Sequence, residues 1–158
     1  MVFRKLLCKL NLSKEIEVHF YQTTLKMYSK RSEIDFAEAR SIKEAEIGLF
    51  SFKAEISSNI SEPLVLKNLS VIMNFANLEV QKKLFSVSDA FRQLESISEI
   101  AIPSDTLITE SFNFYLTRDE ISRVISDKNK YQLIFLAEKS DGKFIRSQIP
   151  WVINAIEL

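Results

Sequence analysis

The feature that most constrains this chain is a two-residue alternation of apolar and polar side chains. Residues 15–20 read Glu-Ile-Glu-Val-His-Phe, and residues 50–57 read Phe-Ser-Phe-Lys-Ala-Glu-Ile-Ser. Successive side chains of a β-strand point to opposite faces, so such a segment places one set of residues in a core and the other in water. The sequence therefore predicts half-buried β-strands.

The same period recurs along most of the chain. Residues 69–75, 97–102 and 108–116 alternate in this way, and residues 84–87 form a weaker strand beside the polar run Gln81-Lys82-Lys83, which is typical of a protected sheet edge. The apolar positions change parity at Thr23-Thr24, which indicates a bulge or a strand that crosses between sheets. Because a polar turn at residues 57–63 follows residues 50–57 and precedes the strand that runs through residues 69–75, we expect these two strands to form a hairpin.

A second hairpin is predicted near the C-terminal end. Residues 131–138 and 144–153 are strand-like and flank Ser140-Asp141-Gly142-Lys143. Asp-Gly is typical of a two-residue turn in which both central residues have a positive φ. Residues 133–136 are apolar on both faces of the strand, as expected of a central strand.

Two segments are predicted to be helical. Residues 34–46 are rich in helix formers, although they lack a clear apolar stripe. Thr117-Arg118-Asp119-Glu120 matches a capping box, with Thr117 at the N-cap and Glu120 at the third helical position. One or two helical turns are expected after Thr117.

Together these patterns predict an all-β fold, an antiparallel two-sheet sandwich of seven to nine strands with one or two short helical segments. A chain of 158 residues fits a single domain over residues 1–158, since no repeat or linker divides it. The strand spacing and the terminal hairpin resemble immunoglobulin-type sandwiches in general, so an immunoglobulin-like architecture is expected. The Cys-Trp-Cys framework of that family is absent, so the resemblance is one of architecture.

The charges balance overall but are distributed unevenly. The chain has 21 basic and 21 acidic side chains, so no net field attracts a polyanion, which argues against nucleic acid as a partner. Residues 1–31 carry seven Lys or Arg and two Glu, whereas residues 32–120 carry eight basic and fifteen acidic residues. This asymmetry favours oriented self-association or a charged protein partner.

The sequence offers few groups for catalysis or cofactor binding. It contains one His and one Cys, without the spacing of a metal site. Gly48 and Gly142 stand alone, whereas phosphate-binding loops need closely spaced glycines. Adjacent acids such as Asp119-Glu120 are more typical of a helix N-terminus than of acid–base catalysis. We therefore expect a protein that is not an enzyme and uses no cofactor or metal.

Location is predicted from the cysteine count and from the first residues. A single Cys cannot form an intramolecular disulfide, as is usual in a reducing cytoplasm. The apolar run at the start is interrupted by Arg4, Lys5 and Lys9, so it does not match an export signal. No segment approaches the roughly 18 consecutive apolar residues of a membrane span. The expected location is the cytoplasm, and the excess of Ile, Lys and Asn favours a bacterial or phage gene.

Two features are candidates for binding. Residues 2–10 form a short basic amphipathic segment in which Phe3, Leu6 and Leu7 lie at helical spacing, and such a segment fits a partner's groove or an anionic membrane surface. Trp151 is a candidate interface anchor, because Trp is enriched at binding hot spots. Packing of both features within their own domain is the alternative interpretation.

Three functional hypotheses follow from these observations. The first is a non-catalytic protein–protein interaction module that acts as an accessory subunit, adaptor or inhibitor, with a protein partner or a homo-oligomer. The second is a carrier of a small hydrophobic ligand in a cavity between the sheets. Such a cavity is expected to be lined by Phe52, Phe112, Phe114 and Phe135. The third, a hydrolase, requires two carboxylates within about 5 to 10 Å of each other in a cleft.

Overall fold

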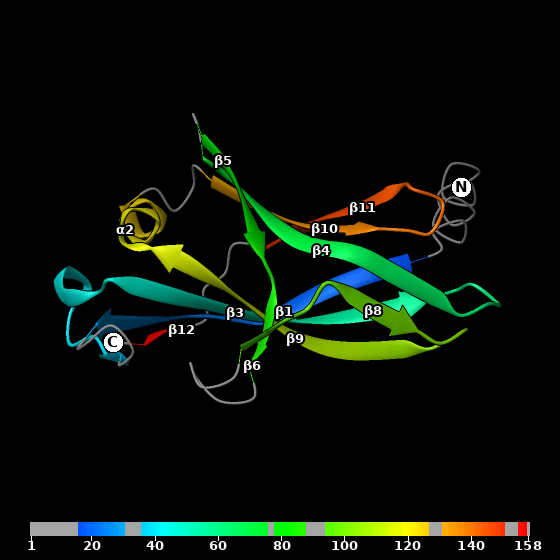
Figure 1. Cartoon of the computed structure of the whole chain (residues 1–158), viewed down its shortest axis with the longest axis horizontal. Coiled ribbons are helices and arrows are strands. Elements are labelled where there is room, and N and C mark those ends of the chain that lie inside the picture. Colours follow the sequence, from blue (N-terminus) through cyan, green and yellow to red (C-terminus); the bar gives the residue numbers. More distant parts are fainter. Residues whose placement is uncertain are drawn as a thin grey trace, which may run out of the picture.

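Two β-sheets packed face to face make up the molecule (Figure 1). The computed structural model describes residues 16–30, 36–75, 78–87, 94–126, 131–150 and 155–157. Strands dominate these residues, and the helical elements among them are one α-helix and one short 3-10 helix. The predicted two-sheet, mainly antiparallel β fold with one or two short helical segments is confirmed.

The larger sheet has the strand order β12-β1-β3-β9-β6-β7, with β2 also paired to β1. Neighbouring strands are antiparallel, except that β1 and β12 run parallel. The long strands β1, β3 and β9 supply most of its inner face. The strand bounds are β1 Ile16–Lys30, β2 Phe36–Glu38, β3 Ile47–Ser58, β6 Phe85–Val87, β7 Leu94–Ser96, β9 Leu107–Thr117 and β12 Ala155–Glu157.

The smaller sheet has the order β11-β10-β4-β5, and β8 also pairs with β4. β10 occupies one edge of β4 from residue 67 to residue 75, while the other edge is shared by β8 at residues 64–67 and β5 at residues 70–75. That shared edge is therefore divided between two short strands. The strand bounds are β4 Leu64–Phe75, β5 Leu78–Lys83, β8 Glu99–Ile102, β10 Tyr131–Glu138 and β11 Phe144–Ile149.

Two segments of the chain leave one sheet and join the other. β5 continues through Leu84 into β6 of the larger sheet, and β7 leads back into β8 of the smaller sheet. Crossings of this kind make the corners of β-sandwiches. They also explain why the described residues contain twelve strands and not the predicted seven to nine, because a strand of three or four residues is too short to show an alternation.

The predicted hairpin between residues 50–57 and 69–75 is wrong. β3 pairs with β1 and β9 in the larger sheet, whereas β4 pairs with β10, β5 and β8 in the smaller sheet. The polar segment between them carries the chain across the sandwich. The alternation of apolar and polar residues determines which face of a strand is buried, but it does not determine which other strand pairs with that strand. The predicted inward residues are accordingly all buried: Phe50, Phe52, Ala54, Ile56, Leu69, Val71, Met73 and Phe75.

The parity change in β1 is a bulge, which confirms one of the two predicted explanations, the other being a strand that crosses between the sheets. The pairing of β1 with β3 shifts register between Tyr21 and Thr24, and Gln22 has a φ of 52°. Leu25 and Met27 are fully buried beyond the bulge. The extra residue thus lets one long strand keep an apolar face on the core along its whole length.

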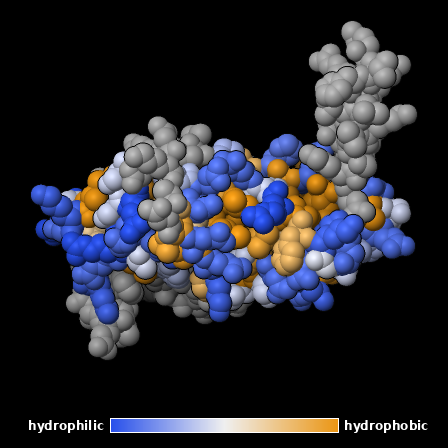
Figure 2. All heavy atoms as spheres, turned by 90° about the horizontal axis from the view of Figure 1, so that it is seen from above, coloured by the Kyte–Doolittle hydropathy of each residue, from blue (hydrophilic) through white to orange (hydrophobic). Residues whose placement is uncertain are grey.

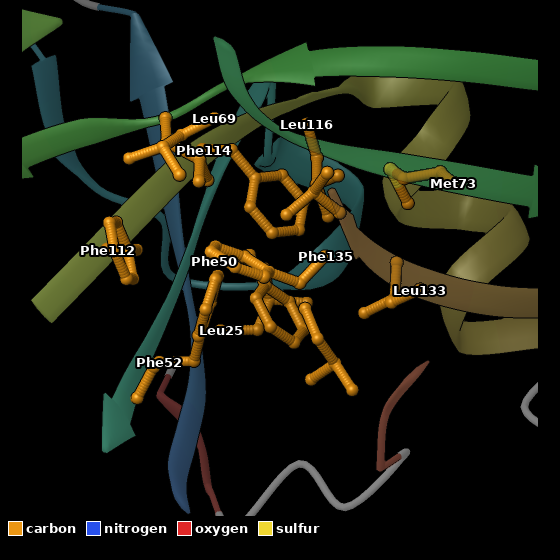
Figure 3. Close-up of a cluster of buried hydrophobic side chains, with 14 of the residues drawn as sticks. Leu25, Phe50, Phe52, Leu69, Met73, Phe112, Phe114, Leu116, Leu133 and Phe135 are labelled. Atoms are coloured by element: carbon orange, nitrogen blue, oxygen red, sulfur yellow. The ribbon is translucent and has the colours of Figure 1, made fainter. Parts of the chain in front are cut away.

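Phenylalanine rings fill the space between the sheets (Figure 3). Phe50 stacks on Phe114 with the ring centroids 4.9 Å apart. Phe135 of the smaller sheet contacts Phe20 and Phe112 of the larger sheet at centroid distances of 5.7 and 5.6 Å. Because these contacts cross the sandwich, the aromatic cluster holds the two layers together.

The helix predicted over residues 34–46 is wrong. Its described part contains the strand β2 and the 3-10 helix η1, Ile42–Glu44. β2 pairs with the end of β1, from Tyr28↔Glu38 to Lys30↔Phe36. The helix formers in this segment have no apolar stripe to bury. Helix propensity alone contributes little free energy per residue, so the hydrogen bonds to β1 outweigh it.

The capping box at Thr117 is confirmed at the start of α2, Arg118–Ser126. The backbone N–H of Glu120 donates to Thr117 Oγ1 at 3.3 Å, and the N–H of Thr117 donates to Glu120 Oε1 at 2.9 Å. The same carboxylate oxygen also accepts a hydrogen bond from Lys82 Nζ at 2.5 Å. This ion pair connects α2, which directly follows β9 of the larger sheet, to β5 of the smaller sheet.

The C-terminal hairpin is confirmed, but its turn differs from the prediction. Gly142, with a φ of 83°, is the residue of this loop in the left-handed region. Its N–H donates to the carbonyl of Lys139 at 2.9 Å, and the N–H of Lys139 donates to the carbonyl of Lys143 at 2.8 Å. The loop therefore has three residues, with Gly in the left-handed position. A hydrogen bond from the Lys143 N–H, helped by the charges of Lys139 and Lys143, lowers the pKa of Asp141.

Gly48 in β3 lies against α2, and we expect Gly48→Ala to lower the free energy of unfolding by about 1–2 kcal/mol. A Cβ at this position would lie 3.0 Å from Cγ1 of Ile121 and 3.2 Å from Cδ1 of Leu25, and both neighbours are buried. Urea denaturation measures the change, with Ser57→Ala in the same strand as the control. Equal or greater stability would show that Ile121 moves aside without cost.

Candidate interaction surface

The interface residues predicted from the sequence are not placed by the structure. Phe3, Leu6, Leu7 and Trp151 lie outside the described residues, and so does the whole basic segment 2–10. Their role as an interface stays a prediction.

The side chains considered for chemistry have structural roles or stand apart. Cys8 lies outside the described residues, and His19 is an exposed side chain of β1 whose Nε2 is 3.9 Å from a carboxylate oxygen of Glu17. Asp119 accepts a hydrogen bond from Arg123 one turn along α2 at 3.0 Å, while Glu120 caps the helix. In the described part of the chain, no three His, Cys, Asp or Glu residues gather as a metal site would require.

The four phenylalanines expected to line a ligand cavity pack against one another. Phe52, Phe112, Phe114 and Phe135 are each at most 1% exposed. Phe52 contacts both Phe112 and Phe114, and Phe112 contacts Phe135, with centroid distances of 5.4, 6.3 and 5.6 Å. Rings in such contact fill the space between the sheets that a ligand would need. Phe52 and Phe112 also border a hollow, which lies on the outer face of the larger sheet.

The outer face of the smaller sheet, by contrast, carries apolar side chains that the core does not use. In β10, the inward residues Leu133, Phe135 and Ala137 are buried, while the outward Ile134 and Leu136 are only partly buried. β10 is a central strand, as predicted, but its second apolar face does not lie under a covering layer of described residues. Figure 2 views the molecule from this side and shows apolar surface between polar side chains.

The strand register shows which side chains lie next to one another on this face. One row across β11, β10, β4 and β5 consists of Arg146, Leu136, Ser70 and Lys83. The next row consists of Gln148, Ile134, Ile72 and Gln81. Neighbours in a row have their Cβ atoms about 5 Å apart. Ile72, Ile134 and Leu136 therefore form one contiguous patch, which we call the apolar centre.

Charged side chains border the apolar centre. Arg146 and Lys83, both exposed, stand at the two ends of one row, in the outer strands β11 and β5. Glu138 lies beyond Leu136 in β10, where an oxygen of its carboxylate accepts a hydrogen bond from Asn68 Nδ2 at 2.5 Å. Phe144 of β11, paired with Glu138, adds an exposed ring at the margin, with 51% of its surface accessible.

A hollow of about 440 Å³ opens at the β5 end of the two rows. It lies where β5 and β8 divide the edge of β4, so the β7–β8 connection passes close by: Ile97 N–H donates to the Leu84 carbonyl at 2.9 Å. Gln81 Nε2 donates to Ser70 Oγ at 3.0 Å inside it. We call this hollow the notch, and its polar lining includes Ser70, Gln81, Lys83, Ser96 and Ser98.

A second hollow of about 440 Å³ lies on the outer face of the larger sheet, beside the bulge of β1. Thr24, Ser51, Lys53 and Ser111 are among its lining residues. Phe52 and Phe112 border it as well, and the rest of its lining is polar: Gln22, Thr24, Ser51, Lys53, Ser111 and Asn113. Lys53 therefore offers a matched comparison for Lys83.

The sequence pattern contains one signal for this surface. Residues 133–136 are apolar on both faces, which predicts a central strand, and a central strand has a covering layer on both faces only where a second layer packs on each. In the described structure one of those faces is open instead. An apolar face without a covering layer within a chain is typical of a surface that contacts another molecule.

Comparison with known proteins finds similar chains among solved structures, all at low sequence identity and low TM-score. No protein-family model matches the sequence, and no curated protein is similar to it in sequence. Similar solved structures include an uncharacterised β-sandwich protein of Clostridium difficile, with 17% identity over 87% of each chain and a TM-score of 0.39. Others are a provisionally named lipoprotein of Bacillus subtilis (14% identity, 87% of this chain and 37% of that one, TM-score 0.48) and a protein of Archaeoglobus fulgidus (8% identity, 83% and 96%, TM-score 0.38). Among the described residues, no helix has the length and apolar character to cross a membrane.

Proposed function

We propose that this protein is a non-catalytic interaction module whose partner protein binds the outer face of the smaller sheet. The observation that carries the proposal is the apolar centre, Ile72, Ile134 and Leu136. Ile72 is 9% exposed and does not belong to the core cluster, because its side chain lies on the face of β4 opposite the inward Val71 and Met73. An apolar patch with a polar rim has the composition of a protein–protein interface.

The edge strand β11 supports the same proposal. Within the described residues β11 pairs with β10 and with no other strand. Its outward side chains, Phe144, Arg146 and Gln148, are all exposed. An open edge offers backbone N–H and C=O groups to an added strand, and the apolar centre beside it would contact the side chains of that strand.

Location and origin are further parts of the proposal. A cytoplasmic role fits the single cysteine, and a bacterial or phage gene fits the residue usage. An immunoglobulin-like relationship rests on the strand spacing and the terminal hairpin alone.

We expect Leu136→Glu to abolish partner binding while leaving the fold intact. A carboxylate in the middle of an apolar contact would be desolvated without a partner, and the affinity should fall by about 30-fold or more. Affinity capture from cells of the source organism with quantitative mass spectrometry measures the loss, and circular dichroism checks the fold.

Leu107→Glu is the matched control, because Leu107 is an exposed leucine, 58% accessible, on the larger sheet. A partner retained by the unmodified protein and by Leu107→Glu, and lost with Leu136→Glu, supports the proposal. If the same proteins are captured by all three, the outer face is not the binding surface. Light scattering would show whether the partner is a second copy of this chain.

A further inference from the structure

We propose that the notch beside Lys83 receives a carboxylate of an acidic, partly apolar peptide that lies across the apolar centre. The inference rests on the proposed function, and it adds the chemistry and spacing of the partner. One row of outward side chains has Lys83 at one end, Arg146 at the other, and Leu136 and Ser70 between them.

Lys83 is an uncompensated cation. Within the described residues it forms no ion pair, and no Asp or Glu lines the notch. Its neighbour Lys82 points to the inner side of β5, where Glu120 neutralises it. A ligand that brings a negative charge to this hollow would therefore gain attraction without displacing an existing partner.

Hydroxyl and amide groups in the notch complement an oxyanion. Ser70 is 5% exposed and its Oγ accepts a hydrogen bond from the Gln81 amide. Its hydroxyl proton donates to no acceptor among the described residues, so it is available to an oxyanion. Ser96 and Ser98 add two further hydroxyls to the lining. A carboxylate accepts several hydrogen bonds at once, and a charge-assisted hydrogen bond is stronger than a neutral one.

The spacing of the two cations indicates the form of the ligand. Lys83 and Arg146 occupy the outer strands of one four-strand row, with Ser70 and Leu136 between them. Three strand spacings amount to about 14 Å, and residues i and i+4 of an extended peptide are about 13 Å apart. A peptide with acids at positions 1 and 5 and a leucine at position 3 therefore places both carboxylates near cations and its leucine over the apolar centre.

The experiment is a titration of the full chain with the peptide acetyl-Glu-Ser-Leu-Ser-Glu-amide, followed by two-dimensional ¹⁵N NMR. We expect shifts concentrated at Ser70, Lys83 and Ser98, and binding about 5-fold weaker in Lys83→Gln, as for one ion pair. The uncharged peptide acetyl-Gln-Ser-Leu-Ser-Gln-amide should bind about 10-fold more weakly or not at all. Lys53→Gln, which alters the hollow of equal size on the other sheet, should bind like the unmodified protein.

Three results would overturn the inference. These are equal binding of the charged and uncharged peptides, equal affinity of Lys83→Gln and the unmodified protein, or no binding of the acidic peptide at millimolar concentration. Each leaves the proposed function standing, because capture of a partner through Leu136 does not depend on a carboxylate in the notch. If Leu136→Glu captures the same proteins as the unmodified protein, the proposed function fails. The peptide titration still tests carboxylate binding in the notch, because it does not depend on the captured proteins.

Discussion

Phe135→Ala is expected to lower the free energy of unfolding by about 4 kcal/mol, the largest effect on stability that we predict for this protein. Phe135 is 0% exposed, and its ring meets Phe20 and Phe112 of the opposite sheet. Removing it would lose the transfer free energy of the ring and would leave a cavity where the sheets meet. Because a domain is usually stable by only about 5–15 kcal/mol, this loss would be a large share of the total.

Equilibrium urea denaturation followed by circular dichroism measures this effect. Phe144→Ala is the matched control, since Phe144 lies on the neighbouring strand β11 but is 51% exposed, and its truncation should cost less than about 0.5 kcal/mol. A cost for Phe135→Ala below about 2 kcal/mol would mean that the rings collapse to fill the space, and that the core is not as closely packed as the ring contacts indicate.

Lys82→Met is expected to lower the free energy of unfolding by about 3 kcal/mol. The side chains of Lys82 and Glu120 are 16% and 8% exposed, so the substitution would leave a nearly buried carboxylate without its ammonium partner. The remaining hydrogen bond, from the Thr117 N–H, would not compensate for that charge. The result would be a weaker connection between α2 and the smaller sheet.

Two further variants separate the ion pair from its surroundings. Lys82→Met combined with Glu120→Gln removes both charges while the glutamine keeps an oxygen for the Thr117 N–H, so it should be more stable than Lys82→Met alone. Asp119→Asn breaks the exposed pair with Arg123 in the same helix and should cost less than about 1 kcal/mol. If Lys82→Met costs no more than Asp119→Asn, water reaches Glu120 and the pair contributes little to stability.

The local elements were predictable where one short stretch of sequence contains all the relevant groups. The capping box is an example, because Thr117 and Glu120 satisfy each other's backbone N–H groups within four residues. The C-terminal hairpin is another, although its turn proved one residue longer because Gly142 alone takes the left-handed conformation of that loop. The prediction of a helix over residues 34–46 is wrong because β2, in this segment, pairs with β1, and a local sequence pattern does not show such a pairing.

The candidate interaction surface shows the same limit. The sequence shows that Ile134 and Leu136 are apolar and predicts a central strand, but it does not show whether another layer of the protein covers their face. The interface residues proposed from the sequence, such as Trp151, were chosen for their residue type and lie outside the described residues. The sequence indicates for Lys83 only a role in protecting a sheet edge, because the notch beside it is built from segments that meet only after folding.

The sequence by itself determined that the chain is a two-sheet β structure, and which side of most strands is dry. Both follow from the period of side-chain direction, which is a property of a few consecutive residues. Only the tertiary structure decided that β3 and β4 belong to different sheets, that β5 and β8 share an edge, and that Arg146, Leu136, Ser70 and Lys83 stand in one row. Those facts depend on hydrogen bonds between strands far apart in the chain, and many pairings satisfy the same alternation equally well.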